Sequence, residues 1–465
     1  MTQGLTGYGA YLPHHRLKRS EIAAALGEGG GKGTRAVASF DEDATSMGVE
    51  AARIALRGAP TPARVLFATA NPPYLDKTNA NVIHAALGLD ASVLAIDVVG
   101  STRSGIGAVV LATETTTPTL AVVTDVRTGL PGGADERDGG DAAAAFVFGG
   151  DGPVLADVLA QASATQEFLD RWRLPGAPAS RVWEERFGEH AYGPLADAAF
   201  TAALKQADLT PADVDVLIVA GTHGRAVKSF AGGAGVAKVA DDLTTAIGNT
   251  GTAHAGVVLA DVLDRAEPGQ TIALVVLADG ATAMVLRTTD AIATRRSSPS
   301  VAQQVEHGDD SLRYTTFLTW RGLLTREPPR RPDPTGPAAP PSLRTEHYKY
   351  GFVGSTCTEC GTIHLPPVRV CVNCKAIDHM AAAPMADVQG QIVTYTVDRL
   401  AYSLSPPVVA AVVDFDGGGR FSCELADVDP ATVRIGDRVE MTFRRIVTAG
   451  GVHNYFWKAR KVEEV

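Results

Sequence analysis

The chain has 465 residues, which is too long for one ordinary core and predicts two or three domains. Its net charge of −10 argues against a sequence-independent nucleic-acid binder, because such a protein needs a basic field. No apolar run approaches the roughly 20 residues of a membrane span, and the N-terminus lacks the pattern of a signal peptide. We therefore expect a cytoplasmic protein that binds neither nucleic acid nor membrane.

Apolar strand-like runs alternate with helical patterns over residues 1–290. Helices are expected at 42–56 and 192–208, with Asp, Thr or Ser available as caps. The alternation predicts α/β layers with buried sheets. Strands are expected at 65–70, 92–99, 119–126, 142–149, 214–221, 271–280 and 282–287.

Two segments of this region resemble two later ones. Residues 98–114 (VVGSTRSGIGAVVLATE) match 247–263 (IGNTGTAHAGVVLADVL), and 140–149 match 278–287. An internal duplication predicts halves of about 1–160 and 161–290, whose two strand-to-helix turns face one central site. Chance similarity between segments rich in Ala, Gly and Val is the alternative.

The remainder of the chain has a different character. Residues 291–345 hold a short amphipathic stretch and then a Pro-rich run, which we interpret as a semi-rigid linker without helix or central strand. A cysteine module over 346–380 follows. Five short strand patterns over 381–465 predict a small closed barrel such as an OB-fold.

Four of the five cysteines form a CxxC-x10-CxxC pattern, which predicts a tetrahedral zinc ribbon, with an iron site as the alternative. The zinc would be structural, because four protein ligands leave no open position. His364 is expected in a loop, and Cys423 as a small buried residue in a strand. The metal ligands are Cys357, Cys360, Cys371 and Cys374.

A zinc ribbon beside an OB-fold raises the possibility of nucleic-acid binding. Residues 346–465 hold 12 Lys and Arg against 14 Asp and Glu, a net charge of −2. The basic footprint that nucleic acids require is therefore missing.

His223 and Asn249 stand at turns where α/β folds place functional loops. Neutral His and Asn side chains donate hydrogen bonds to a developing oxyanion or enolate, and helix N-termini at the turns add partial positive charge. The alternatives are a packed histidine and a helix-capping asparagine.

The segment DVVGSTRSGIG (97–107) lies where a strand turns into a helix, a common place for a nucleophile. The residue at the turn is Thr102, beside Ser101, and the first 356 residues contain no cysteine. A hydroxyl needs a dedicated base, whereas a thiol is readily activated at a helix N-terminus. A covalent acyl-enzyme on Thr102 or Ser101 is therefore the minor alternative.

With these segments in view, the chain resembles the thiolase superfamily, in the branch of hydroxymethylglutaryl-CoA synthases and chain-starting ketoacyl synthases. The resemblance implies a duplicated five-layered α-β-α-β-α core over 1–290 and a homodimer. The C-terminal part resembles the zinc ribbon and all-β OB-fold domain that accompanies thiolase-like proteins. The supporting segments are 7–17, 41–56, 75–89, 97–107, 139–150 and 247–251.

In that family a cysteine at the first turn accepts the acyl group, while His and Asn bind the thioester carbonyl. His223 and Asn249 match the latter positions, but Thr102 stands at the cysteine position. The hydroxymethylglutaryl-CoA synthases also carry a glutamate where this chain offers Ala70 or Asn71. Both departures argue against the usual acylation and condensation.

We therefore expect an enzyme that forms a thioester enolate without acyl transfer, as in aldol cleavage or condensation of a 3-hydroxyacyl-CoA. The alternatives are an acyltransferase or condensing enzyme, and a non-catalytic acyl-CoA-binding scaffold for a partner thiolase or another acyl-CoA enzyme. The thioester carrier is coenzyme A or an acyl-carrier protein.

Further residues are assigned by role. The general base is sought among Tyr74, Asp76 and His254. The expected contacts of the coenzyme A portion are Arg103, Arg225 and Lys228, with a local ion pair as the alternative for Arg103.

Overall fold

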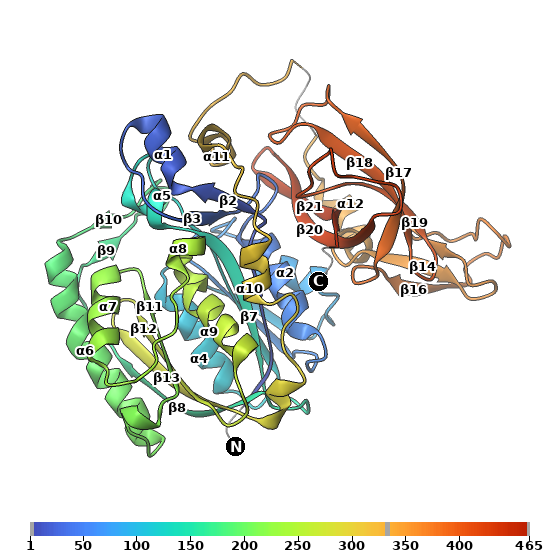
Figure 1. The fold of residues 1–465 in the computed structure, drawn as a ribbon. Coiled ribbons are helices and arrows are strands. Elements are labelled where there is room, and N and C mark those ends of the chain that lie inside the picture. Colours follow the sequence, from blue (N-terminus) through green and yellow to red (C-terminus); the bar gives the residue numbers. More distant parts are fainter. Residues whose placement is uncertain (1–3, 331–334, 463–465) are drawn as a thin grey trace. The chain divides into compact units, whose positions relative to one another are not determined.

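The computed structural model describes residues 4–330 and 335–462, and the chain forms two compact units (Figure 1). The first unit runs to Ser39 and then covers Asp43–Asn81 and Ala91–Phe317. The second takes Phe40–Glu42, Val82–Asp90 and the chain from Leu318 onward.

The elements up to residue 320 follow the expected alternation of strands and helices. The strands are β1 (Leu5–Tyr11), β2 (His15–Lys18), β3 (Thr34–Val37), β4 (Arg64–Thr69), β5 (Leu94–Val99), β6 (Thr119–Val126), β7 (Asp141–Phe148), β8 (Ala156–Ala164), β9 (Arg171–Trp172), β10 (Arg181–Val182), β11 (Val216–Gly221), β12 (Thr271–Leu277) and β13 (Ala281–Thr288). The helices are α1 (Arg19–Leu26), α2 (Ala44–Leu56), α3 (Ala80–Ala86), α4 (Arg103–Thr113), α5 (Ala134–Asp138), α6 (Glu185–Gln206), α7 (Gly224–Gly233), α8 (Thr244–Ile247), α9 (His254–Arg265), α10 (Val301–Glu306) and α11 (Tyr314–Trp320).

The main sheet has nine strands in the order β11-β12-β13-β8-β1-β7-β6-β4-β5. Read outward from the centre, β1-β7-β6-β4 and β8-β13-β12-β11 show the same sequence of pairings, two antiparallel and then one parallel. A parallel β5 extends the first half, and an isolated parallel bridge between Leu217 and Val239 lies at the equivalent place in the second. The topology confirms the duplicated core.

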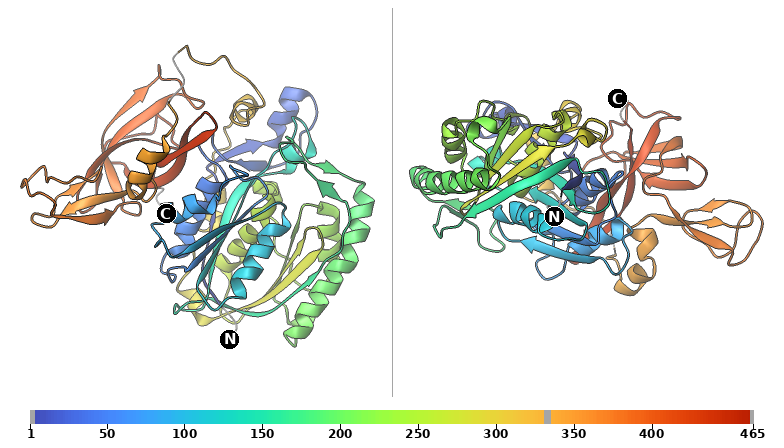
Figure 2. Two further views of the ribbon diagram at one scale, coloured as in Figure 1. Left: turned by 180° about the vertical axis from the view of Figure 1, so that it is seen from behind. Right: turned by 90° about the horizontal axis from the view of Figure 1, so that it is seen from below.

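The helices pack in layers around the two half-sheets (Figures 1 and 2). Helix α2 packs against β1, β6 and β7, whereas α6 packs against β8, β12 and β13, and α7 against β11. Helices α4 and α9 each contact strands of both half-sheets, so they form the middle layer. The expected α-β-α-β-α arrangement is confirmed.

Local sequence explains several of these elements. Helix α2 begins with a capping box: Asp43 Oδ1 accepts from the backbone N–H groups of Thr45 and Ser46 at 3.0 and 2.9 Å. The eight residues of β7 are all buried, and their many alanines allow helices to approach closely. Helix α6 begins at Glu185, earlier than the expected 192, and continues through Pro194.

The second unit is mainly β-structure, as expected. Its remaining helices are short. One of them, α12, lies in the Pro-rich run and corrects the prediction of a linker without helix. Two prolines of the run stand in the first turn of α12, where the missing N–H costs no hydrogen bond. The elements are α12 (Ala339–Arg344), α13 (Glu346–Lys349), β14 (Val353–Cys357), β15 (Ile363–His364), β16 (Met380–Pro384), β17 (Gly390–Asp398), β18 (Val408–Phe415), β19 (Arg420–Glu424), β20 (Arg438–Ala449) and β21 (Val452–Lys461).

These strands form a three-stranded sheet, β15-β14-β16, and a five-stranded sheet, β19-β18-β17-β20-β21. A bridge between Leu425, just after β19, and Ala459 of β21 joins the two ends of the larger sheet, as a barrel requires. Among the helices that the structure describes, none is both long and apolar enough to cross a membrane.

A buried ion network holds the early segment Phe40–Glu42 within the second unit. The Arg444 guanidinium, which is fully buried, pairs with Asp41 at 3.4 Å and with Glu42 at 3.1 Å. Lys458 Nζ lies 2.9 Å from Asp41. Burial acts to raise the pKa of Asp41, but the charges of Arg444 and Lys458 outweigh it and hold that pKa below its usual value.

Candidate active site and metal centre

The first strand-to-helix turn carries Thr102 at the N-terminus of α4. Gly100 adopts φ +137°, a conformation that favours glycine, and its N–H donates to Thr69 O at the end of β4. Thr102 itself has helical backbone angles and is half-buried. Within residues 4–330 and 335–462, no group forms a hydrogen bond with its hydroxyl. The turn therefore presents a threonine without a base.

The second turn, at residues 247–253, lies directly against the first. A methyl group added to Gly105 of α4 would lie only 2.4 Å from the carbonyl oxygen of Thr252. Thr252 also contacts the end of β6: its backbone N–H and its side-chain hydroxyl both donate to Asp125 Oδ2, each at 3.1 Å. Burial raises the pKa of Asp125. The two turns thus meet at one edge of the sheet.

His223 follows the end of β11 and caps α7. Its Nδ1 accepts from the N–H of Ala226 at 3.1 Å, so the neutral ring carries its proton on Nε2. Nε2 donates to the carbonyl oxygen of Glu185 at 2.9 Å. The ring is buried and has its donor fixed toward the first turn of α6.

Asn249 lies beside the same strand end. Its Nδ2 donates to Gly221 O at 2.8 Å, and its Oδ1 accepts from Gly251 N at 3.0 Å. These two backbone contacts fix the orientation of the amide and leave one amide hydrogen for a further acceptor. The structure therefore brings His223 and Asn249 together at the carboxyl end of β11, through Gly221.

A buried carboxylate that the sequence did not single out faces His223. Asp170 is 3% exposed, and its Oδ1 has no hydrogen-bond partner among the described residues. A methyl group on Gly188 would lie 2.5 Å from Asp170 Oδ1 and 2.6 Å from His223 Nε2, so these groups face each other across this glycine. Burial raises the pKa of Asp170, while His223 and Arg171 oppose the shift.

The three expected base candidates lie in different surroundings. Asp76 is exposed, and the backbone of Tyr74 is held by the side chain of Asn79. His254 is buried at the start of α9, where its Nδ1 lies 3.3 Å from Thr250 N. Burial lowers the pKa of His254 to about 4, so the imidazole is neutral at physiological pH.

Of the three expected coenzyme A contacts, Arg103 lies at the start of α4, and Arg225 and Lys228 lie together on α7. Arg103 donates to Ala278 O at 3.2 Å and to Thr165 Oγ1 at 2.8 Å, and so holds the turn between β12 and β13. Arg225 is exposed and pairs with Glu185 at 2.9 Å, and Lys228 is exposed on the same helix. Arg103 is thus engaged with protein groups, whereas the α7 pair is open to solvent.

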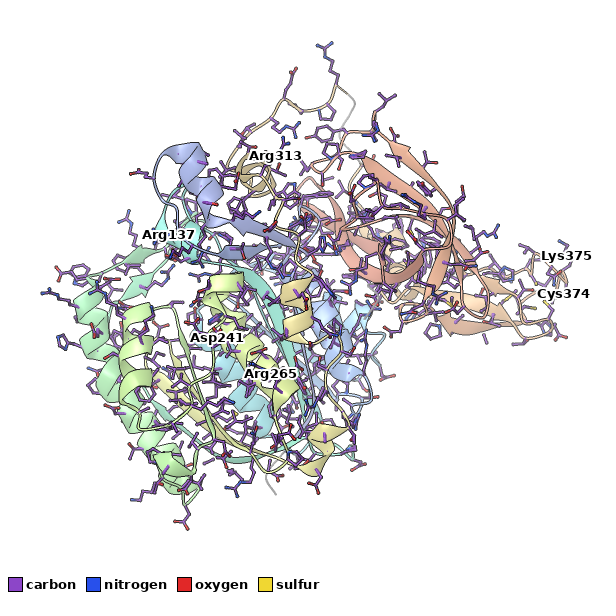
Figure 3. The ribbon with its side chains drawn as sticks, in the orientation of Figure 1. Arg137, Asp241, Arg265, Arg313, Cys374 and Lys375 are labelled. Atoms are coloured by element: carbon purple, nitrogen blue, oxygen red, sulfur yellow. The ribbon has the colours of Figure 1, made fainter. Side chains whose placement is uncertain are left out.

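The four cysteines of the CxxC pairs gather at the end of the three-stranded sheet, where Figure 3 labels Cys374. Their sulfur atoms all lie within 4.8 Å of one another, with Cys357–Cys374 and Cys360–Cys371 at 3.6 Å. Tetrahedral Zn–S bonds of about 2.3 Å require sulfurs about 3.8 Å apart, so the set fits zinc.

Two other residues of the second unit that the sequence analysis noted, His364 and Cys423, lie in strands. His364 lies buried in β15, which corrects the expected loop. Cys423 lies in a strand, β19, as expected, but it is half-buried and not fully buried, and burial raises its pKa to about 12.

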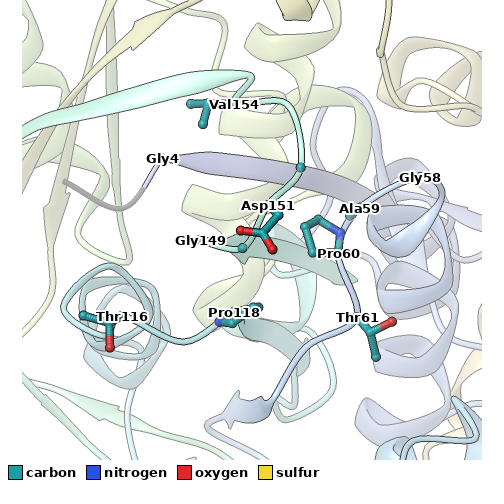
Figure 4. Close-up of a pocket in the computed structure, with 12 residues that line it drawn as sticks. Gly4, Gly58, Ala59, Pro60, Thr61, Thr116, Pro118, Gly149, Asp151 and Val154 are labelled. Carbon is teal, nitrogen blue, oxygen red and sulfur yellow. The ribbon is translucent and has the colours of Figure 1, made fainter. Parts of the chain in front are cut away.

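A cavity of about 780 Å³ lies far from the turns (Figure 4). It is lined by residues that precede β4 and β6, such as Pro60 and Pro118, and by Asp151. Because β4, β5 and β6 are parallel, their amino ends lie at the edge opposite Thr102. We assign this cavity no part in the site.

Two family models match the C-terminal part. The model described as ChsH2, rubredoxin-like zinc ribbon domain, matches residues 348–377, and the model described as ChsH2, C-terminal OB-fold domain, matches 383–444. The matches agree with the clustered cysteines and the five-stranded sheet.

The chain is 31% identical over 344 residues to the hydroxymethylglutaryl-CoA synthase of Pyrobaculum aerophilum, covering 69% of this chain and 96% of that protein. The synthase of Aeropyrum pernix is 32% identical over 324 residues, covering 65% and 89%. A solved HMG-CoA synthase complexed with CoA shares the fold with a TM-score of 0.57, 16% identity, and coverage of 68% and 89%. The 3-oxoacyl-(acyl carrier protein) synthase III of Pseudomonas aeruginosa does so with a TM-score of 0.54, 20% identity, and coverage of 62% and 99%. The chain belongs to the hydroxymethylglutaryl-CoA synthase family of thiolase-like proteins and carries a zinc ribbon and an OB-fold at its C-terminus.

Proposed function

We propose that this protein makes or breaks a carbon–carbon bond next to an acyl-CoA thioester through an enolate, without an acyl-enzyme. The observation that carries the proposal is the contrast at the two turns. The Thr102 hydroxyl has no hydrogen-bond partner among the described residues, whereas His223 Nε2 and Asn249 Nδ2 are held as donors at the end of β11. The described residues thus include donors suited to an enolate, whereas none of them is hydrogen-bonded to the Thr102 hydroxyl as an activating base.

Retro-aldol cleavage of a 3-hydroxyacyl-CoA fits these groups. A base takes the proton of the 3-hydroxyl, the bond between C2 and C3 breaks, and C3 leaves as a ketone or aldehyde. The electron pair passes to the thioester, whose oxygen accepts from His223 Nε2 and from the second amide hydrogen of Asn249. Protonation at C2 yields the shortened acyl-CoA, and the reverse sequence is an aldol condensation. In this scheme the thioester oxygen replaces Glu185 O as the acceptor of His223.

Asp170 is the base that the geometry favours. Its buried Oδ1 is unpartnered among the described residues and faces the imidazole of His223 across Gly188. A buried carboxylate with a raised pKa is a stronger base than an exposed one. Exposed Asp76 and neutral, hydrogen-bonded His254 lack this combination.

The second function is a condensing or acyl-transfer reaction, which the names of the relatives favour. In that case Thr102 would carry the acyl group as an ester. Its β-branch crowds the hydroxyl, and no base supports it in the described part of the chain. We rank this function second.

The test is incubation with a panel of 3-hydroxyacyl-CoA esters, followed by detection of a carbonyl product and a shortened acyl-CoA. We expect His223→Ala to abolish turnover and Thr102→Ala to retain most of it. Parallel assays with acyl-carrier-protein thioesters identify the carrier. An acyl adduct in the intact-protein mass that Thr102→Ala removes would overturn the proposal in favour of acyl transfer.

We further propose that β5 pairs with β5 of a second copy. It is the edge strand of the nine-stranded sheet, and its Leu94, Ile96 and Val99 are 51%, 39% and 43% exposed. An exposed apolar edge strand readily pairs with another chain. Light scattering should give a dimer mass for the wild type and a monomer for Ile96→Lys, and a monomeric wild type would rule the pairing out.

A further inference from the structure

Two arginines, Arg127 and Arg173, lie at the carboxyl ends of β4 and β6. Neither is among the site residues expected from the sequence. Arg173 follows β9, and its Nη2 donates to Ala70 O at 2.7 Å. Its Nη1 donates to Thr128 Oγ1 at 3.0 Å and lies 3.4 Å from Asn71 Oδ1. The guanidinium therefore contacts Ala70 and Asn71, the two positions at which the family resemblance predicts a glutamate.

This guanidinium is close to both turns. Ala70 follows Thr69, whose carbonyl accepts from Gly100 of the first turn. Arg127, after β6, packs on the second turn, since a methyl group on Gly251 would lie 2.8 Å from Arg127 Cδ. Gly251 has φ +57°, so glycine is favoured there for its backbone as well. Arg127 and Arg173 thus lie on the side of the sheet edge that holds Thr102 and Asn249.

Among the described residues, no carboxylate forms an ion pair with Arg173. Asp135 pairs with both Arg171 and Arg127. Asp125 accepts from Thr252 and interacts electrostatically with both Arg127 and Arg173, so its one charge is shared between two guanidinium groups. In the described part of the chain, the hydrogen-bond acceptors of Arg173 are neutral, and no carboxylate lies within ion-pair distance of it. Arg127 Nε, which is buried, has no hydrogen-bond partner there either.

We propose that Arg173, supported by Arg127, forms an anion subsite for an oxyanion carried by the acyl portion of the thioester. The inference rests on the proposed function, because it places the acyl group between the two turns. A guanidinium has five N–H donors in a planar fork that suits a carboxylate or an alkoxide. Two sources supply that chemistry: a permanent carboxylate on the acyl chain, or the C3 oxygen as it loses its proton.

The first arm of the test measures binding. Glutaryl-CoA and its terminal amide both lack a 3-hydroxyl and cannot undergo the cleavage. If the acyl chain carries the anion, the wild type binds glutaryl-CoA about tenfold or more tightly than the amide by calorimetry. Arg173→Gln removes the preference and Arg181→Gln, an exposed arginine on β10, retains it. The wild-type comparison stands even if a variant folds poorly.

The second arm measures turnover of a cleaved 3-hydroxyacyl-CoA. If the C3 oxygen is the anion, Arg173→Gln lowers kcat by about 100-fold with little change in KM, and Arg173→Lys restores part of the rate. Equal binding of the two glutaryl thioesters together with an unchanged kcat in Arg173→Gln overturns the subsite alone. Failure of the wild type to bind or cleave any thioester overturns the proposed function, and the subsite with it.

Discussion

Asp170 and His223 face each other across Gly188. A methyl group on this glycine would lie 2.5 Å from the carboxylate oxygen Oδ1 and 2.6 Å from the imidazole Nε2. Neither residue is near the other in sequence. Their meeting depends on the β9–β10 hairpin, because Trp183 at its end donates to the Asp170 carbonyl and α6 begins directly afterwards. The pair thus brings the proposed base, Asp170, and the proposed oxyanion donor, His223, close together.

Asp170→Asn should lower kcat/KM by about 100-fold, the usual contribution of a general base. The active form of Asp170 is the carboxylate, so wild-type activity should fall as pH decreases through a pKa that burial places above the ordinary value of about 3.9. This acid limb should be absent in Asp170→Asn. Glu184→Gln, an exposed carboxylate at the start of α6, is the matched control. An unchanged acid limb in Asp170→Asn would assign the base to another residue.

Gly105→Ala should destabilise the protein by about 1–3 kcal/mol, because its methyl group has only 2.4 Å to the carbonyl oxygen of Thr252. The displacement separates the two turns and should also reduce turnover. Gly107→Ala, two residues along the same helix, has no atom within 4 Å of the new methyl group. That control should be neutral or stabilising by about 0.5–1 kcal/mol in urea unfolding, since alanine favours helix. Equal stability of the two variants would contradict the close approach.

His254 should titrate at about 4 in NMR spectra of the folded protein, because burial disfavours its charged form more than Asp242 stabilises it. Its folded pKa lies below the unfolded value of about 6.5. The neutral form is therefore favoured by folding, and its contribution is complete above about pH 6.5 and is lost as pH falls toward 4. His254→Asn should reduce this acid destabilisation. A titration near 6.5 that shapes the pH dependence of kcat would restore His254 as a base candidate.

Metal analysis should find one zinc ion per chain, held by the four clustered thiolates. Cys371→Ser should lose the zinc and destabilise the three-stranded sheet, because ligand binding and folding of such modules are coupled. Cys423→Ala removes a thiol that lies in β19 and should keep the full zinc content. Iron in place of zinc would support the alternative that the same four cysteines form an iron site.

Much of this protein follows from local sequence. Periodicity located seven of the nine strands of the main sheet, because buried strands are continuous apolar runs whatever their neighbours, but it did not locate β1 and β8. The two turns were visible as repeated segments, and the metal ligands as paired cysteines at fixed spacing, since a knuckle needs only four consecutive residues. In the second half, His223 could be named from its place after a strand and Asn249 from its place in the repeated turn.

Other features arose only from tertiary contacts. Asp170 and Arg173 are ordinary polar residues of a short hairpin, and nothing in their local pattern distinguishes them from exposed ones. Their roles depend on which strand ends the hairpin covers: Asp170 reaches His223 on β11, and Arg173 reaches Ala70 on β4. The same holds for Gly105, whose missing side chain matters only because Thr252 lies against it. Sequence determined which elements form, because that depends on near neighbours, whereas the base and the anion subsite depend on side chains that only folding brings within a few ångströms.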